Sequence, residues 1–188
     1  MSVNIQLEWT PNPSTLKYVV DTQLLPRGAM NFTTRELAVE RSPLASRLFD
    51  IKGVLAVMLG TNFVTVTKGD EGEWDELNDG VMLTLDQHLS ANEVVVKPEV
   101  LAEMAAKAIT AGGTDMEVRI REILDNEIRP AVAQDGGDIT LDRVENGSVF
   151  LHMQGSCAGC PSSTATLRMG IETRLREAIP EIVEVVAV

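Results

Sequence analysis

A glycine-containing break, Thr110-Ala-Gly-Gly-Thr114, divides the chain into two parts that each carry their own pattern of helices and strands. Segments of this composition behave as flexible connectors, because glycine has little preference for either regular structure. The chain has 188 residues, which is enough for two small domains. We therefore predict domains at residues 1–90 and 115–188, joined by a partly helical connector over residues 91–114.

The first part has the pattern of an antiparallel sheet with helices. Apolar residues alternate at Ile5, Leu7 and Trp9, which is typical of a strand with one apolar face. Ser42-Pro43 combines a favoured N-cap with proline at the first helical position, so a helix is predicted to begin there. The full set of predicted elements is strands at 5–9, 16–21, 54–59 and from Phe63 onward, and helices over 42–49 and 74–89.

The second part predicts elements in the order α-β-β-α-β. Thr114 or Asp115 can cap the first helix, and Pro130 is predicted to lie just past its end. The sequence Glu145-Asn-Gly147 is a strong signal for a hairpin turn. The predicted elements are a helix over 115–128, strands over 139–144 and 148–154, a helix over 162–179 and a strand over 182–188. Both parts therefore predict the α+β fold class.

The charge of the chain argues against several classes of partner. The formal net charge is −12, and no basic stretch interrupts it, so nucleic acid and anionic membranes are not expected partners. No apolar run is long enough to span a bilayer. The N-terminus carries neither a secretory signal nor a basic transit peptide, and two cysteines do not make a disulfide scaffold, so we predict a cytoplasmic protein.

The two cysteines of the chain, Cys157 and Cys160, lie between a predicted strand and a predicted helix. The N–H groups and dipole of a helix N-terminus favour thiolates there. Thiolate-bound zinc and iron–sulfur centres usually take four protein ligands, and one chain supplies only two. His88 lies in a distant predicted helix, and His152 alternates with apolar residues, which predicts a solvent-exposed side chain. We therefore predict one metal site shared by two chains.

Three interpretations of the cysteine pair remain open from the residues alone. Iron–sulfur and zinc sites share tetrahedral thiolate geometry, so either could bridge two chains. A redox-active dithiol also lies between a strand and a helix, although here that strand belongs to a hairpin and no aromatic residue precedes Cys157.

The acidic segment Asp135-Gly-Gly-Asp138 lacks the further carboxylates of a calcium loop, so it predicts a tight turn.

The residues around the cysteine pair resemble a known family. The resemblance to the C-terminal domain of NifU, the Nfu-type iron–sulfur scaffold domain, covers about residues 115–188 and is carried by Asp135-Gly-Gly-Asp138, Gly155-Ser-Cys157-Ala-Gly-Cys160-Pro-Ser-Ser, Thr166-Leu-Arg-Met-Gly-Ile-Glu172 and Pro180-Glu. The first part resembles the N-terminal domain of the Nfu family through Thr10-Pro-Asn-Pro-Ser-Thr-Leu16-Lys-Tyr, Ser42-Pro-Leu-Ala and Leu48-Phe-Asp-Ile-Lys-Gly53-Val.

The resemblance implies a scaffold or carrier that binds a 4Fe–4S cluster between two subunits through Cys157 and Cys160, with 2Fe–2S and zinc as alternatives. Gly155, Gly159 and Pro161 match the motif positions that would shape the turn. The implied partners are an upstream assembly scaffold, apo iron–sulfur client proteins and a second copy of the chain in a cluster-dependent homodimer. Two ligands per chain make a site that opens when the subunits separate, so we expect binding and transfer, not an enzyme.

Overall fold

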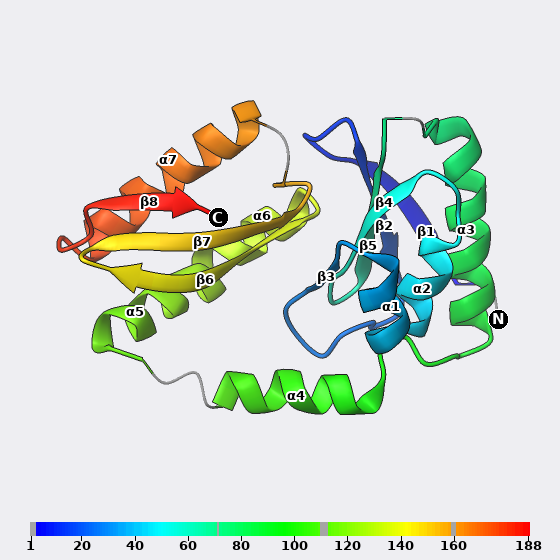
Figure 1. The fold of residues 1–188 in the computed structure, drawn as a ribbon, viewed down its shortest axis with the longest axis horizontal. Helices are drawn as coiled ribbons and strands as arrows, with labels where there is room; N and C mark the ends of the chain where they lie inside the picture. The colour runs from blue at the N-terminus through cyan, green and yellow to red at the C-terminus, as the bar shows by residue number, and fades with distance from the viewer. Residues whose placement is uncertain (1–2, 71, 110–112, 159–160) are drawn as a thin grey trace.

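Two hydrophobic cores organise the chain, one on each side of residues 102–115. The computed structural model describes residues 3–70, 72–109, 113–158 and 161–188. A helix, α4 (Pro98–Ile109), runs between the two lobes that contain these cores (Figure 1). The helix predicted in the connector is therefore present, whereas part of the predicted break, residues 110–112, lies outside the described residues. The domain boundaries at residues 90 and 114 stay predictions.

The first lobe is a five-stranded antiparallel sheet with helices on one face. The strands are β1 (Ile5–Trp9), β2 (Thr15–Val20), β3 (Met30–Phe32), β4 (Val54–Leu59) and β5 (Phe63–Lys68), in the spatial order β1-β2-β5-β4-β3. The helices are α1 (Arg35–Arg41), α2 (Pro43–Phe49) and α3 (Trp74–Ser90). Ser42 caps α2 as predicted, because its side chain accepts a hydrogen bond from the Ala45 N–H. Strand alternation sends Leu16 and Tyr18 into the core with the helices.

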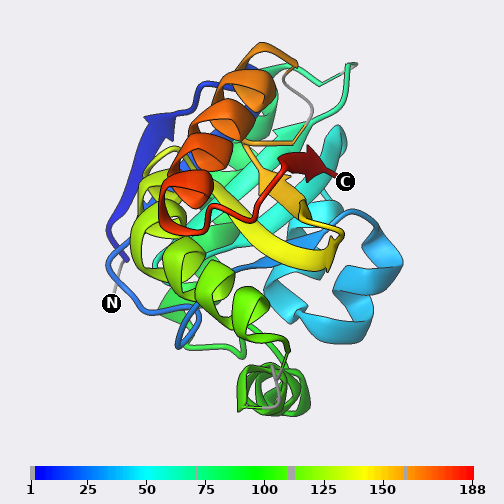
Figure 2. The same cartoon turned by 90° about the vertical axis from the view of Figure 1, so that its left-hand side faces the viewer.

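The second lobe has the predicted element order. The elements are α5 (Asp115–Ile123), a π-helical turn η1 (Leu124–Ile128), α6 (Arg129–Gln134), β6 (Gly137–Glu145), β7 (Ser148–Gly155), α7 (Pro161–Ala178) and β8 (Glu184–Ala187). Strand β7 pairs antiparallel with β6 and parallel with β8, and the α5–α6 run and α7 pack against this small sheet (Figure 2). The predicted α+β fold class is confirmed.

The helical run from α5 to α6 begins where the sequence predicts but continues beyond its predicted end. Thr114 and Glu117 form a reciprocal capping box at the start of α5, as the sequence predicts. The predicted end before Pro130 is wrong, because the helical run continues to Gln134. Proline cannot donate the hydrogen bond of a regular α-helix. The wider turn η1, in which the Arg129 N–H donates to the Leu124 carbonyl, lets the run pass through Pro130.

The second lobe covers the face of the first sheet that α1–α3 leave open (Figure 1). Strand β7 contacts β4 and β5. This face carries Lys17, Met58 and Thr65, and each of these side chains is less than 10% exposed. None of the helices in the described ranges has both the length and the apolar character needed to span a bilayer.

Candidate functional site

Cys157 lies in the turn that follows β7 and belongs to the second hydrophobic core. The residue is only 7% exposed. Its sulfur rests against the backbone at the start of β6, since a Cβ added to Gly137 would lie 2.3 Å from Cys157 Sγ. The same Cβ would lie 3.1 Å from Val132 Cγ1. The absence of a side chain at Gly137 therefore creates the space that the thiol occupies.

Hydrogen bonds join the cysteine turn to the preceding turn at residues 135–136. The Ser156 hydroxyl donates to the Asp135 carbonyl at 2.5 Å, and the Ser156 N–H donates to the Gly136 carbonyl at 3.1 Å. Gly136 and Gly155 both have positive φ, +76° and +64°, which favours glycine at these two positions. The predicted Asp-Gly-Gly turn is present, but only its first glycine uses the left-handed region, and Gly137 serves instead to make room for Cys157.

The surroundings of Cys157 in this conformation favour the protonated thiol over the thiolate. Burial raises the pKa of Cys157 to about 11; the Ser156 hydrogen bond acts in the opposite direction, and the carboxylates of Asp135 and Asp138 add to the increase. The expected lowering of this pKa by the helix N-terminus is therefore wrong for the conformation described, because desolvation dominates. Since metals bind the deprotonated form, metal binding at Cys157 has to displace the thiol proton.

The other residues of the motif are only partly visible. Gly159 and Cys160 lie outside the described residues, so the predicted pairing of Cys157 with Cys160 stays a prediction. His88 is buried in the first core, with Nε2 3.1 Å from the Val94 carbonyl. His152 is exposed, as predicted, with Nδ1 3.2 Å from the Val188 carbonyl. Within the described ranges, no group of three or more His, Cys, Asp or Glu residues is placed to hold a metal ion.

Asp138 forms a buried ion pair that sequence reasoning did not foresee. Arg129 donates to its two carboxylate oxygens at 2.7 and 2.9 Å, and the Asp138 side chain is 6% exposed. A second carboxylate, that of Asp125, also accepts from Arg129 at 2.7 Å. The pair anchors the start of β6 to the start of α6, and it uses the Asp138 oxygens that a metal would need.

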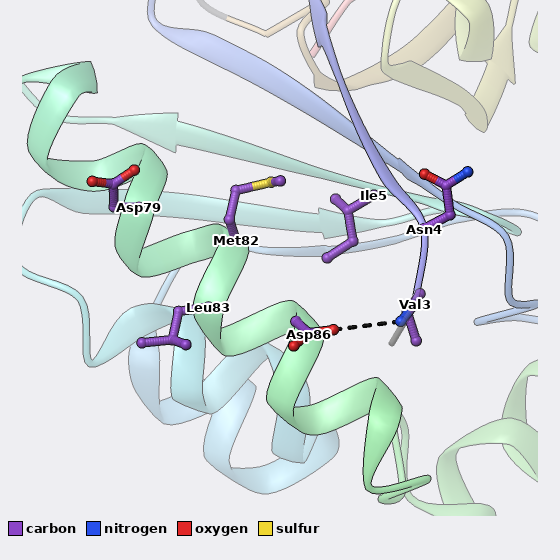
Figure 3. Close-up of a pocket in the computed structure, with 7 residues that line it drawn as sticks. All are labelled: Val3, Asn4, Ile5, Asp79, Met82, Leu83 and Asp86. Atoms are coloured by element: carbon purple, nitrogen blue, oxygen red, sulfur yellow. Dashed lines mark hydrogen bonds between the residues drawn. The ribbon is translucent and has the colours of Figure 1, made fainter. Parts of the chain in front are cut away.

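Asn12 and Lys17 of the first lobe also contact the site, and neither contact is predicted from the sequence. The side-chain amide of Asn12 donates to the Ala158 carbonyl at 3.0 Å. The ammonium of Lys17 donates to the Gln134 carbonyl at 2.9 Å. A separate groove lies between residues 3–5 and helix α3, lined there by Asp79, Met82, Leu83 and Asp86 (Figure 3). None of its lining residues belongs to the cysteine motif.

Replacing Gly137 with Ala is expected to destabilise the second lobe by about 1–3 kcal/mol, because the new methyl group would overlap the Cys157 sulfur. Urea unfolding measures the loss. Gly170→Ala in α7 is the control, since a Cβ there meets nothing within 4 Å. Adding Cys157→Ala to Gly137→Ala should recover most of the loss. A Gly137→Ala variant as stable as the unmodified protein would mean that the thiol does not occupy this space.

Comparison with known proteins gives the family of the chain. Residues 5–92 match the family described as scaffold protein Nfu/NifU N terminal, and residues 120–186 match the NifU-like domain. The chain is 38% identical over 179 residues to the human NFU1 iron–sulfur cluster scaffold homolog, mitochondrial, which covers 95% of this chain and 69% of that protein. The chain belongs to the Nfu family of iron–sulfur cluster scaffold proteins. The family resemblance expected from the motifs is thereby confirmed.

One more curated relative and one solved structure are also similar to this chain. NifU-like protein 4, mitochondrial, from Arabidopsis thaliana is 37% identical over 180 residues, covering 95% of this chain and 63% of that protein. A solution structure of a NifU-like protein from Saccharomyces cerevisiae is 23% identical, with a TM-score of 0.47, and covers 52% of this chain and 87% of that one. The chain thus spans roughly two thirds of the length of the two curated relatives.

The predicted cytoplasmic location is wrong by this comparison, because the human and Arabidopsis relatives are both named as mitochondrial. The prediction rested on the first residues of the chain and on its low cysteine content. Two reduced thiols require a reducing environment, which is not unique to the cytosol. The first residues of a given chain do not establish its compartment either.

Proposed function

We propose that this chain carries a 4Fe–4S cluster as cargo between two copies of itself, each of which supplies Cys157 and Cys160. The observation that carries the proposal is the cysteine pair itself, which lies in the sequence between β7 and α7 of a chain that belongs to the scaffold family. In this proposal the cluster comes from an upstream assembly scaffold and passes to apo iron–sulfur proteins.

Ligand number supports a shared site. A 4Fe–4S cluster is usually held by four thiolates, and the chain contains two cysteines. The net charge of −12 opposes association of two copies when no cluster is bound. Four thiolates can approach each other only when the iron supplies compensating positive charge. Cluster binding and dimer formation are therefore one coupled event in this proposal.

Transfer without turnover is the role that this arrangement favours. A site that is split between two subunits opens when they separate, which releases the cargo to a client with its own thiolates. The surroundings of Cys157 in the chain argue against a redox dithiol, because the preceding strand β7 pairs with β6 in a hairpin instead of belonging to a βαβ unit, and no aromatic residue precedes Cys157. We therefore propose that the protein is a carrier and not an enzyme.

Anaerobic reconstitution of the full chain with iron and sulfide tests the proposal. We expect about four iron and four sulfide ions per two chains, a visible absorption band of an iron–sulfur centre, and a dimer in sedimentation that is absent before reconstitution. The loaded protein should activate an apo 4Fe–4S enzyme faster than free iron and sulfide at the same concentration. A loaded monomer would refute the shared site, and equal activation rates would refute the carrier role.

A further inference from the structure

The first domain holds the loop that contains the cysteine motif. Asn12 lies in the turn between β1 and β2, and its side-chain amide donates to the carbonyl of Ala158, the residue that follows Cys157. The side-chain oxygen of Asn12 accepts from the Ser14 N–H at 3.0 Å, which fixes the direction of the amide. Asn12 is 6% exposed. This contact joins residues 146 positions apart in the sequence, so it belongs to the packing of the two domains.

A second contact reaches the turn on which Cys157 rests. Lys17, in β2, is 7% exposed, and its ammonium donates to the Gln134 carbonyl while it pairs with Glu8 at 2.9 Å. Lysine is rarely buried to this degree unless it is paired. The first lobe therefore supplies two hydrogen-bond donors to this region, Asn12 to the cysteine turn and Lys17 to the end of α6.

Close packing accompanies these two hydrogen bonds. A Cβ added to Gly136 would lie 2.8 Å from Thr65 Cγ2, and one added to Gly155 would lie 2.7 Å from Met58 Cε. Both glycines flank the segment that holds Cys157 against Gly137. The first sheet thus fits directly over the turns that keep the thiol buried.

The interface between the two lobes contains polar groups, which is typical of an interface that can separate. Its face of the first sheet carries the charge of Lys17 and the hydroxyl of Thr65, and within the described part of the chain the Thr65 hydroxyl has no hydrogen-bond partner. Both groups would be hydrated if the domains separated, and burying an unpaired hydroxyl is unfavourable. Polar contacts of this kind are typical of domain interfaces that form and dissolve.

We propose that the sheet face of the first lobe that carries Lys17, Met58 and Thr65 is a cap over the cysteine turn at residues 156–158, and that Asn12 and Lys17 hold it in place. In this proposal the cap must move away before two copies can share a cluster. The inference rests on the proposed function, because it assigns the capped form to the unloaded monomer and the uncapped form to the loaded dimer. In this proposal, a second copy would have to approach the surface around Gly136, Gly155 and Ala158, which the first lobe covers. Since the cluster would bind only the uncapped form, weakening the cap speeds loading.

Asn12→Asp tests the cap. The aspartate keeps an oxygen for the Ser14 N–H but replaces the donor to the Ala158 carbonyl with a carboxylate that repels it. Alkylation of Cys157 by iodoacetamide in the metal-free full chain, followed by mass spectrometry, should be about tenfold faster than in the unmodified protein, the ratio expected for losing one such hydrogen bond. The control is Asn4→Asp, which makes the same charge change at an exposed residue and should leave the rate unchanged.

Lys17→Met gives an independent second test, with the exposed Lys52→Met as its control. It should also accelerate alkylation, whereas Thr65→Val, which removes the unpartnered hydroxyl without changing the shape of the side chain, should slow it. Alkylation rates that match the controls in Asn12→Asp and Lys17→Met would overturn the cap. Faster alkylation in a chain that never binds a bridging cluster would support the cap and refute the proposed function instead.

Discussion

Replacing either Cys157 or Cys160 with Ser is expected to abolish both the bridging cluster and the dimer that depends on it. Each substitution removes two of the four thiolates at once, because the shared site takes the same residue from both copies. A serine hydroxyl stays protonated at neutral pH and is a harder ligand than thiolate, so it does not replace the sulfur. Iron and sulfide content, visible absorption and sedimentation after anaerobic reconstitution measure the loss.

The matched control for the cysteine variants is Ala158→Ser, which introduces the same hydroxyl into the same turn but leaves both thiols in place. It should bind the cluster and dimerise. Because Cys157 is part of the core and Ala158 is exposed, the folding of each variant is checked by its urea midpoint. A full cluster in Cys157→Ser or Cys160→Ser would show that other residues ligate it.

Replacing Arg129 with Met is expected to destabilise the second domain by about 3–5 kcal/mol. The substitution leaves the Asp138 carboxylate, whose side chain is 6% exposed, without the guanidinium that donates to both of its oxygens. Breaking a buried ion pair by removing one partner costs this much because the remaining charge stays desolvated. Urea unfolding at neutral pH, followed by circular dichroism, measures the difference.

Arg174→Met is the control for Arg129→Met. Arg174 donates to both carboxylate oxygens of Glu127 at 2.7 and 2.9 Å, so the geometry is the same, but this pair is exposed to solvent. Its loss should have a much smaller effect, since water screens exposed pairs. The double variant Arg129→Met with Asp138→Leu should recover most of the stability, because no unpaired charge remains. Equal losses for Arg129→Met and Arg174→Met would contradict the assignment of a buried pair.

Local signals in the sequence predict much of this fold. The Ser42-Pro43 cap and the hairpin turn at Asn146-Gly147, where both residues have positive φ, form as expected because each depends on residues within one turn of chain. The sequence does not predict the π-helical turn before Pro130, since its existence depends on how α6 packs. A proline alone equally favours a helix that simply ends.

For the candidate site too, the sequence predicts some features and not others. The cysteine motif and its family are visible in the sequence, because spacing and residue type carry that information. The burial of Cys157 against Gly137 and the reach of Asn12 to Ala158 are not visible, because each joins segments that are distant along the chain. The raised pKa of Cys157 follows from that burial, so reasoning from the helix N-terminus alone gave the wrong direction.

Because the helical run passes through the π-helical turn at Leu124–Ile128, the number of residues in the run sets the direction of every side chain beyond it. Each residue of an α-helix advances the chain by ~100° about the axis, so one residue fewer would rotate everything beyond it by that angle. Arg129 would turn away from Asp138, and the Gln134 carbonyl would turn away from Lys17. Related chains should therefore keep the same number of residues between Thr114 and Gly137.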